Sequence, residues 1–126
     1  MQELKNLGVG TDIEDVGRFR NLDRNKNGNF LDKIFTKKEL DYSFSKAKPY
    51  QHLAARYAGK EAVVKALGSL GRQGIDYKDI EILNDNNGIP KVNLNHNSGL
   101  KVNISLSHSN DRALAFAVIT QNQNEH

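Results

Sequence analysis

The feature that most constrains the fold is a long helical segment followed by several short strand-like segments. Residues 50–67 are the most strongly helical stretch, and Gly68 is expected to cap that helix at its C-terminus. After a glycine-rich link, four strands are predicted in "DIEILND", "IPKVNLN", "KVNISLSHS" and "RALAFAVI". The turn "NDNNG" separates the first two, which should pair as a hairpin. Strands gathered after helices indicate an α+β fold, with an antiparallel sheet packed against the long helix.

The N-terminal part of the chain is predicted to pass from a strand into a helix near Asp12. "LGVGTDI" is short and β-like. An apolar residue then recurs every three positions, a helical stripe made of Ile13, Val16, Phe19 and Leu22. Arg18 and Arg20 belong to this predicted helix, and their side chains are expected to project away from the stripe.

The next segment, "LDRNKNGNFLDKIF" at residues 22–35, resembles a calcium-binding loop, because Asp23, Asn25 and Asn27 alternate before a glycine. Such a loop needs a bidentate carboxylate at its last position, where this chain has Ile34. The stretch is therefore predicted to be a solvated turn.

A further helix is predicted to begin at Thr36, because "FTKKEL" has the form of a capping box. The Thr36 hydroxyl can accept a free backbone N–H at the helix start while Glu39 reaches back. Leu40 and Phe44 share one face of this helix, and Pro49 separates it from the long helix.

Composition excludes several classes of protein. The 126 residues are expected to form one domain, residues 1–126. No apolar run is long enough to span a membrane, and the N-terminus lacks the apolar stretch of a signal peptide. The chain has no cysteine, so disulfides and thiol chemistry are excluded and a cytoplasmic protein is expected. The histidines show no zinc-binding spacing.

Positive charge is concentrated in the middle of the chain. Residues 18–65 hold twelve Lys and Arg against five Asp and Glu, whereas the whole chain has a net charge of only +3. This asymmetry is typical of a surface that meets a nucleic acid, a phosphorylated small molecule or an acidic protein. A solvated basic face without a partner explains the charge equally well.

Acidic residues gather at the predicted strand-to-helix junction, where Asp12 is followed by Glu14 and Asp15. Acids are favourable at a helix N-terminus because they interact with the helix dipole. They are also ligands for a hard cation, since Mg²⁺ is typically held by one or two carboxylates together with substrate phosphates. The junction alone does not decide between these roles.

A second cluster lies on the long helix in "RYAGKEAVVKALG". Glu61 and Lys65 are four residues apart and share a face, as in an ordinary surface ion pair. Ala54 and Ala58 lie along the same stripe, and such small residues leave room for a ligand to approach the helix. A third cluster, "SLSHSN", ends a half-buried strand, and none of its serines lies in a nucleophile elbow.

Taken together, five motifs resemble those of the holo-acyl-carrier-protein synthases, which are 4′-phosphopantetheinyl transferases. They are, in order, "GVGTDIEDVGRF", "FTKKEL", "RYAGKEAVVKALG", "GIPKV" and "VNISLSHSNDRALAFAV". The resemblance extends from Gly8 to Val118, and the combination of Asp12 with the "KEAVVKA" core is highly specific. Gly59 stands where the family more often has alanine, which is expected to loosen the helix slightly.

The resemblance implies transfer of phosphopantetheine from coenzyme A to a serine of an apo acyl carrier protein, with release of 3′,5′-ADP. It assigns Asp12 and Glu61 as ligands of Mg²⁺, and Glu61 and Lys65 as catalytic residues, with Lys65 neutralising charge on a phosphate. Glu61 and a metal-bound water both remain candidates for the base that deprotonates the serine. The implied coenzyme A site consists of Arg56, Lys65, Gly88, Pro90, Ser107 and His108.

The resemblance also implies partners. Arg18 and Arg20 would bind the carrier protein, which is acidic and would account for the basic surplus in residues 18–65. Short members of the family are homotrimers with active sites between subunits, and this chain matches the short type.

Two other functions fit parts of the sequence. A non-enzymatic nucleic-acid-binding module would place aromatic residues among its basic clusters, but residues 18–65 place few there. A magnesium-dependent nucleotide hydrolase would share the acid pair and would turn over without a carrier protein. Neither nucleic acid nor a membrane is expected as a partner of the family that the chain resembles.

Overall fold

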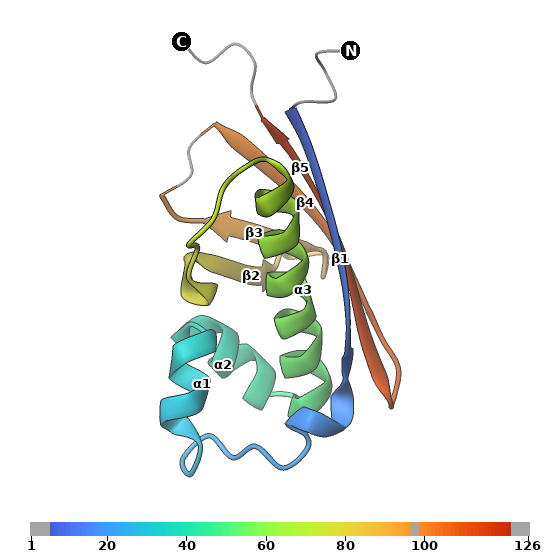
Figure 1. Ribbon diagram of the computed structural model, residues 1–126. Coiled ribbons are helices and arrows are strands. Elements are labelled where there is room, and N and C mark those ends of the chain that lie inside the picture. Colours follow the sequence, from blue (N-terminus) through green and yellow to red (C-terminus); the bar gives the residue numbers. More distant parts are fainter. Residues whose placement is uncertain (1–5, 97–98, 122–126) are drawn as a thin grey trace.

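A single long helix, α3 (Pro49–Ser69), runs along a three-stranded antiparallel sheet in the computed structural model, which describes residues 6–96 and 99–121 (Figure 1). The predicted α+β class is confirmed. The other elements are β1 (Leu7–Asp15), the 3₁₀ helix η2 (Val16–Phe19), α1 (Gly28–Ile34), α2 (Lys37–Phe44), the 3₁₀ helix η3 (Tyr77–Asp79), β2 (Ile80–Asn84), β3 (Pro90–Leu94), β4 (Leu100–His108) and β5 (Arg112–Gln121). None of the helices in the described part of the chain is long and apolar enough to cross a membrane.

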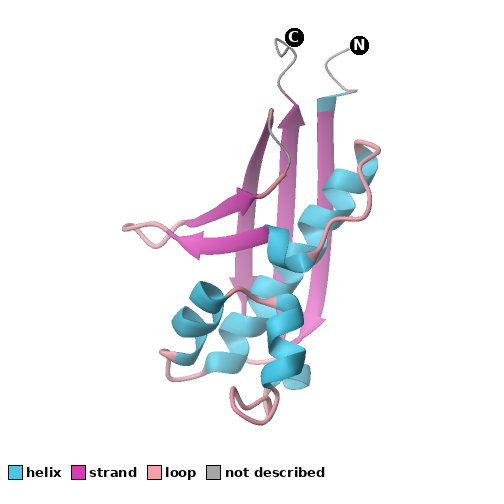
Figure 2. Cartoon of the chain, turned by 90° about the vertical axis from the view of Figure 1, so that its left-hand side faces the viewer, coloured by secondary structure: helices cyan, strands magenta, loops and turns pink. Residues whose placement is uncertain are grey.

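The strands form two sheets rather than one. β5 is the central strand of the order β1-β5-β4, and every neighbouring pair is antiparallel. The predicted hairpin is formed by β2 and β3, which pair only with each other and run across the three long strands (Figure 2). All helices of the described residues lie on one side of the long sheet, and none of them covers its other side (Figure 1).

Glycines allow β1 to lie very close to α3. A Cβ atom at Gly8 would be 2.4 Å from the carbonyl oxygen of Ala66, and one at Gly10 would be 2.0 Å from that of Ala62. On the other side of α3, a Cβ at Gly59 would meet only side-chain ends, the nearest being Ile82 Cδ1 at 2.6 Å. The close approaches at Gly8 and Gly10 bring the side chains of β1 within reach of those on α3.

The expectation that small residues on α3 leave room for a ligand is wrong for Ala54 and Ala58. Both side chains are fully buried, Ala54 in the core beside α1 and α2 and Ala58 in the core beneath the sheets. Their small size serves packing between the helix and its neighbours.

The predicted helix after Asp12 is also wrong, because β1 continues to Asp15, which pairs with Arg112 of β5. Ile13 is therefore a strand residue and is 61% exposed. Only η2 is helical, and its three-residue turn buries Val16 and Phe19 one above the other. A stripe of period three fits a short 3₁₀ turn as well as an α-helix.

The stretch predicted as a turn at residues 22–35 is only partly a turn. Asp23 Oδ1 accepts hydrogen bonds from the backbone N–H groups of Asn25 and Lys26, which is turn chemistry and satisfies the carboxylate without calcium. Residues 28–34 form α1 instead, because Leu31 and Ile34 reach the core.

The boundaries of α2 and α3 follow from their caps. The predicted capping box is present, with Thr36 Oγ1 accepting from the N–H of Glu39 and Glu39 Oε1 accepting from the N–H of Thr36. Gly68 is not the C-cap of α3 but lies inside the helix. Gly71 has φ of +82° and makes the Schellman turn, in which the N–H of Arg72 donates to Leu67 O at 2.9 Å.

Candidate functional site

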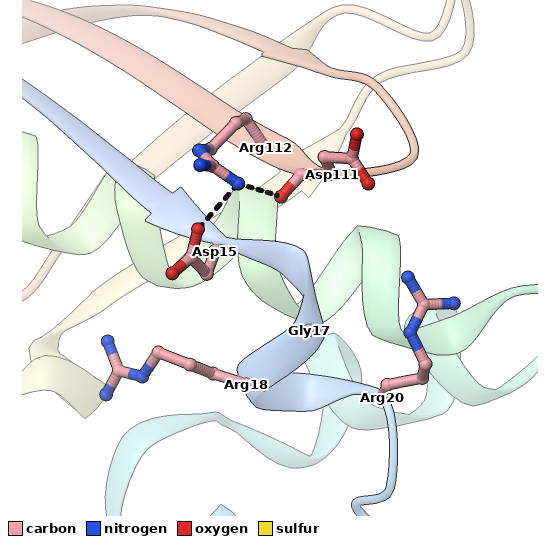
Figure 3. A pocket seen from close by; sticks show the side chains of 6 residues that line it. All are labelled: Asp15, Gly17, Arg18, Arg20, Asp111 and Arg112. Atoms are coloured by element: carbon pink, nitrogen blue, oxygen red, sulfur yellow. Dashed lines mark hydrogen bonds and ion pairs between the residues drawn. The ribbon is translucent and has the colours of Figure 1, made fainter.

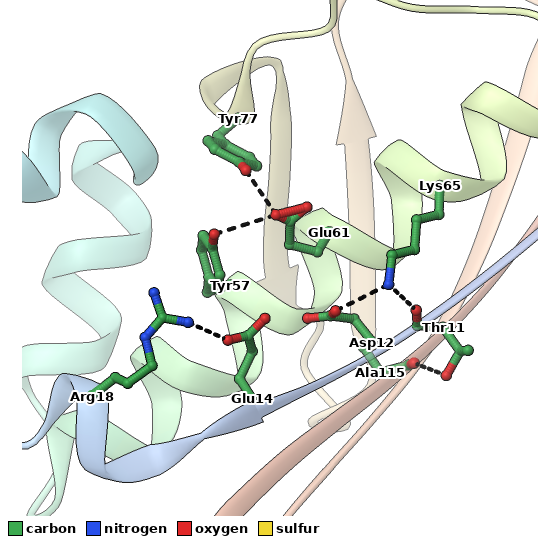
Figure 4. Close-up of polar contacts among 9 residues, drawn as sticks. All are labelled: Thr11, Asp12, Glu14, Arg18, Tyr57, Glu61, Lys65, Tyr77 and Ala115. Atoms are coloured by element: carbon green, nitrogen blue, oxygen red, sulfur yellow. Dashed lines mark hydrogen bonds and ion pairs between the residues drawn. The ribbon is translucent and has the colours of Figure 1, made fainter.

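An acid–lysine cluster lies where β1 crosses α3 (Figure 4). Asp12 and Glu14 are two residues apart on the strand and therefore share the face that meets the helix. Lys65 Nζ lies 3.2 Å from Asp12 Oδ1 and donates to Thr11 O at 3.0 Å. Among the described residues, Glu61 and Lys65 do not form the surface ion pair that their spacing allows. Lys65 pairs with Asp12 instead.

Two tyrosines hold the carboxylate of Glu61. The Tyr77 hydroxyl donates to Glu61 Oε2 at 2.8 Å, and the Tyr57 hydroxyl donates to the same oxygen at 3.3 Å (Figure 4). Burial, followed by the hydrogen bond to Glu61, raises the pKa of Tyr77, and burial is also the main cause of the raised pKa of Tyr57. Both phenols are therefore protonated donors at neutral pH.

Glu14 is the acid of this cluster whose protonation is most perturbed. Burial raises the pKa of Glu14 from its ordinary value of 4.5 to about 7, helped by a hydrogen bond to Asp12 and by the negative charges of Asp12 and Glu61. Arg18 opposes the shift, because its guanidinium lies 2.6 Å from Glu14 Oε1. The negative charges of Asp12 and Glu61 thus favour the protonated form of Glu14.

The carboxylates of this cluster are the kind of oxygen ligands that a hard cation binds. Asp12 Oδ2 is buried and accepts no hydrogen bond from an N–H group or a hydroxyl of a described residue, which leaves the carboxyl of Glu14 as its polar neighbour. No group of three or more His, Cys, Asp or Glu side chains among the described residues is arranged to hold a metal by itself. Asp12 and Glu61 are the carboxylates that would hold a hard cation such as Mg²⁺, which in proteins uses one or two carboxylates and takes its other oxygens from water and substrate phosphates.

A pocket of about 180 Å³ lies on the other side of α3. It gathers four residues of the predicted coenzyme A site, namely Arg56, Gly88, Pro90 and His108. The structure adds residues that sequence reasoning missed, which are Tyr42, His52, Ala55, Asn84 and Leu106. These come from α2, α3, β2 and β4, and no local pattern in the sequence links them.

The pocket is positively charged at its base. Arg56 is only 2% exposed, its guanidinium lies 4.2 Å from the centre of the Tyr42 ring, and no described carboxylate forms an ion pair with it. Arg56 Nε has no hydrogen-bond partner in the described structure. Burial and the neighbouring charges of Arg56 and His108 lower the pKa of His52 to about 4. A buried cation without a carboxylate partner is suited to receive an anionic ligand.

Two predicted residues of the coenzyme A site do not line this pocket. Ser107 is exposed on β4 and alternates with Leu106 and His108, so it lies on the opposite face of the sheet. Lys65 follows Arg56 by nine residues, about half a turn around α3. Within one chain, the acid–lysine cluster and the Arg56 pocket therefore occupy different faces of the helix.

Arg18 and Arg20, the predicted carrier-protein contacts, line an open depression of about 530 Å³ together with Asp15, Gly17, Asp111 and Arg112 (Figure 3). Arg18 does not project away from the apolar stripe, because its guanidinium lies 5.9 Å from the centre of the Phe19 ring and 5.7 Å from that of Tyr57. Its side chain is nevertheless 59% exposed. Arg20 lies over the Tyr50 ring and forms no ion pair with a described acid.

Comparison with known proteins identifies relatives over almost the whole chain. Residues 8–118 match the 4′-phosphopantetheinyl transferase superfamily. A holo-[acyl-carrier-protein] synthase of Thermodesulfovibrio yellowstonii is 45% identical over 90% of this chain and 97% of its own, and one of Clostridium perfringens strain SM101 is 42% identical over 90% and 92%. The crystal structure of a holo-(acyl-carrier-protein) synthase from Bacillus anthracis in complex with CoA (3′,5′-ADP) is 29% identical over 91% of this chain and 96% of that one, with a TM-score of 0.74.

Proposed function

Because the chain belongs to the 4′-phosphopantetheinyl transferase superfamily and to its holo-[acyl-carrier-protein] synthases, we propose that it transfers phosphopantetheine from coenzyme A to an apo acyl carrier protein. The reaction joins the serine hydroxyl oxygen of the carrier to the phosphorus that bears pantetheine. The pyrophosphate P–O bond breaks, 3′,5′-ADP leaves, and the serine proton passes to a base. The observation that carries this proposal is the buried oxygen of Asp12, which accepts no N–H or hydroxyl hydrogen bond from a described residue and lies beside Glu61 and Lys65.

Asp12 and Glu61 are the proposed ligands of Mg²⁺, which when bound would neutralise the pyrophosphate and stabilise the charge that grows as the bond breaks. Lys65 is accessible for a second role, since its side chain is 55% exposed and its only described partners are Asp12 and Thr11 O. Its ammonium group would turn toward a phosphate oxygen and lower the barrier by electrostatic stabilisation. Glu61 lies in the same cluster and is a candidate for the base that accepts the serine proton.

The Arg56 pocket is the proposed site of the 3′-phosphoadenosine end of coenzyme A. Arg56 supplies positive charge, the imidazoles of His52 and His108 supply ring N–H donors, and the backbone turn at Gly88 and Pro90 forms one wall. The B. anthracis relative was crystallised in complex with CoA, which supports coenzyme A as the ligand class. The phosphate would replace the carboxylate that Arg56 lacks.

A homotrimer is part of the proposal, because one chain presents the two halves of the site on different faces of α3. The uncovered side of the long sheet carries exposed apolar side chains, which are Leu7, Val9, Ile13, Leu114 and Phe116. In the antiparallel pairing of β1 with β5, Ile13 lies opposite Leu114 on that side. The exposed apolar side chains therefore form a patch. Exposed apolar patches of this kind mark protein interfaces. Ser107 pairs with Leu114 and would thus reach a site shared with a neighbouring subunit.

The depression at Arg18 and Arg20 is the proposed docking surface for the acidic carrier protein. Arg20 has no acidic partner among the described residues, so an acid of the carrier would not have to displace one. Arg18 lies between this surface and the acid cluster, because its guanidinium also contacts Glu14. The carrier would therefore bind beside the reacting groups.

The proposal is tested by incubating the protein with coenzyme A, Mg²⁺ and an apo acyl carrier protein, and then measuring the mass of the carrier and the release of 3′,5′-ADP. We expect the carrier to gain one phosphopantetheine group for each 3′,5′-ADP released. A parallel reaction without the carrier identifies a nucleotide hydrolase, because such an enzyme would cleave coenzyme A there. Cleavage without the carrier, or an unchanged carrier mass, would refute the proposal.

A further inference from the structure

Glu61 differs from the other acids of the cluster in receiving two phenol hydrogen bonds on one oxygen. Both donors, Tyr57 and Tyr77, bind Oε2, while Oε1 accepts no hydrogen bond from a described residue (Figure 4). The two tyrosine rings lie 5.6 Å apart, and Tyr57 packs against Phe19 with centroids 5.7 Å apart. A carboxylate fixed in this way has one oxygen occupied and the other left for a ligand.

Tyr77 is the better placed of the two donors. Its hydroxyl is 2.8 Å from Glu61 Oε2, whereas that of Tyr57 is 3.3 Å away, at the weak end of hydrogen bonding. Tyr57 and Glu61 are four residues apart on α3, so their contact follows from the helix itself. Tyr77 instead lies on η3, sixteen residues beyond Glu61 in the chain.

The backbone of Tyr77 is anchored to α3 by a buried lysine. Lys60 Nζ donates to Tyr77 O at 2.8 Å and also to Ile80 O, and its side chain is fully buried. Its charge is balanced by Glu39, whose Oε1 lies 2.8 Å away. Lys60 directly precedes Glu61 on α3, so its hydrogen bond holds the segment that carries Tyr77 against the helix one residue from Glu61.

We propose that Tyr77 is a positioning residue, which holds Glu61 Oε2 so that Oε1 is oriented for the divalent cation. This inference rests on the proposed function, in which Glu61 is a metal ligand. Partners that hydrogen-bond to a metal ligand orient it, and losing one typically costs about 10-fold or more in metal affinity. Tyr77 lies outside every motif by which the sequence resembles its family.

The test compares Tyr77→Phe with Tyr57→Phe, which removes the same atom from the same acceptor at the longer distance. Binding of Mn²⁺ in the presence of coenzyme A is measured by the electron paramagnetic resonance signal of the free ion, with coenzyme A alone as the blank. We expect Tyr77→Phe to weaken Mn²⁺ binding about 10-fold and Tyr57→Phe to weaken it less than about 3-fold. The Mg²⁺ concentration for half-maximal transfer should rise by the same factors, with the KM for carrier protein and the melting temperature unchanged.

A wild-type protein that binds no Mn²⁺ with coenzyme A, and transfers without Mg²⁺, would refute the proposed metal site and this inference with it. If the wild type binds Mn²⁺ and Glu61→Gln does not, the metal site stands. In that case, equal Mn²⁺ binding by Tyr77→Phe and the wild type would overturn the positioning role alone. A fall in kcat at every Mg²⁺ concentration without a change in metal requirement would also overturn it.

Discussion

Lys60 Nζ lies 2.8 Å from Glu39 Oε1, and both side chains are fully buried. This ion pair joins three elements, because Glu39 also caps α2 and Glu39 Oε2 accepts the N–H of Ile82 in β2. Burial lowers the pKa of Lys60, whereas the charge of Glu39 raises it, so the two groups depend on each other. The pair thus fixes α2 and the start of β2 against α3, and with them the walls of both halves of the proposed site.

Lys60→Met is expected to lower the free energy of unfolding by about 3–5 kcal/mol, because it leaves the Glu39 carboxylate buried without its cation. The double variant Lys60→Met, Glu39→Leu should recover only part of the loss, since Tyr77 O, Ile80 O and the Ile82 N–H would then lack partners. Urea unfolding at pH 7 measures both. A loss of less than about 1 kcal/mol in the single variant would show that the pair is not structural.

Glu14 should make stability depend on pH. Its pKa is about 7 in the folded protein and 4.5 ordinarily, so the folded state holds the proton more tightly. Stability from this group is therefore fully present below about pH 4.5 and is lost as pH rises toward 7. In the absence of divalent ions, Glu14→Gln should flatten the decline of unfolding free energy across this interval. An identical decline in wild type and variant would contradict the shifted pKa.

Arg20→Glu tests the docking surface more cleanly than a change at Arg18, which would place a new acid against Glu14. We expect a higher KM for the carrier at low salt, a flatter salt dependence and little change in kcat, because rim charges govern encounter more than chemistry. Lys78→Glu makes the same change of charge at an exposed position on η3 and serves as the control. Equal carrier KM values for the two variants would remove Arg20 from the interface.

The intersubunit site predicts complementation between inactive subunits. Asp12→Asn removes a proposed metal ligand, and Arg56→Met removes the buried cation of the proposed coenzyme A pocket. Each variant alone should be nearly inactive. If Asp12 of one subunit works with Arg56 of its neighbour, equal mixing after reversible dissociation should restore about a quarter of wild-type activity, since subunits in a ring combine at random. No recovery in a mixture shown to exchange subunits would place both residues in one chain's site.

The elements best predicted from the sequence are those fixed by local interactions. The Thr36 capping box and the hairpin turn before Pro90 depend on residues a few positions apart, and both are present. The end of β1 and the helix α1 were not predictable in this way. Pairing of Asp15 with Arg112 and burial of Leu31 depend on segments far along the chain.

The distinction between features fixed by nearby residues and features fixed by distant segments also holds within the candidate site. Arg56, Gly88, Pro90 and His108 were expected from the family resemblance, and one pocket gathers them. Tyr77 gives no local signal, because its contact with Glu61 requires the link between α3 and β2 to fold back over the helix. The partners of the buried Arg56 likewise come from α2 and β2, which only the tertiary fold brings together.

In the proposed function, Asp12 and Glu61 act as a pair that holds Mg²⁺ against the pyrophosphate of coenzyme A. Asp12→Asn and Glu61→Gln keep the shape of each side chain and remove its charge, so their folds can be checked by melting temperature. The decisive measurement is the rate at which the apo carrier gains mass, followed across a Mg²⁺ titration at saturating coenzyme A. We expect each variant to lose nearly all transfer at every Mg²⁺ concentration, while the wild type saturates. Near-normal turnover by either variant would contradict the claim.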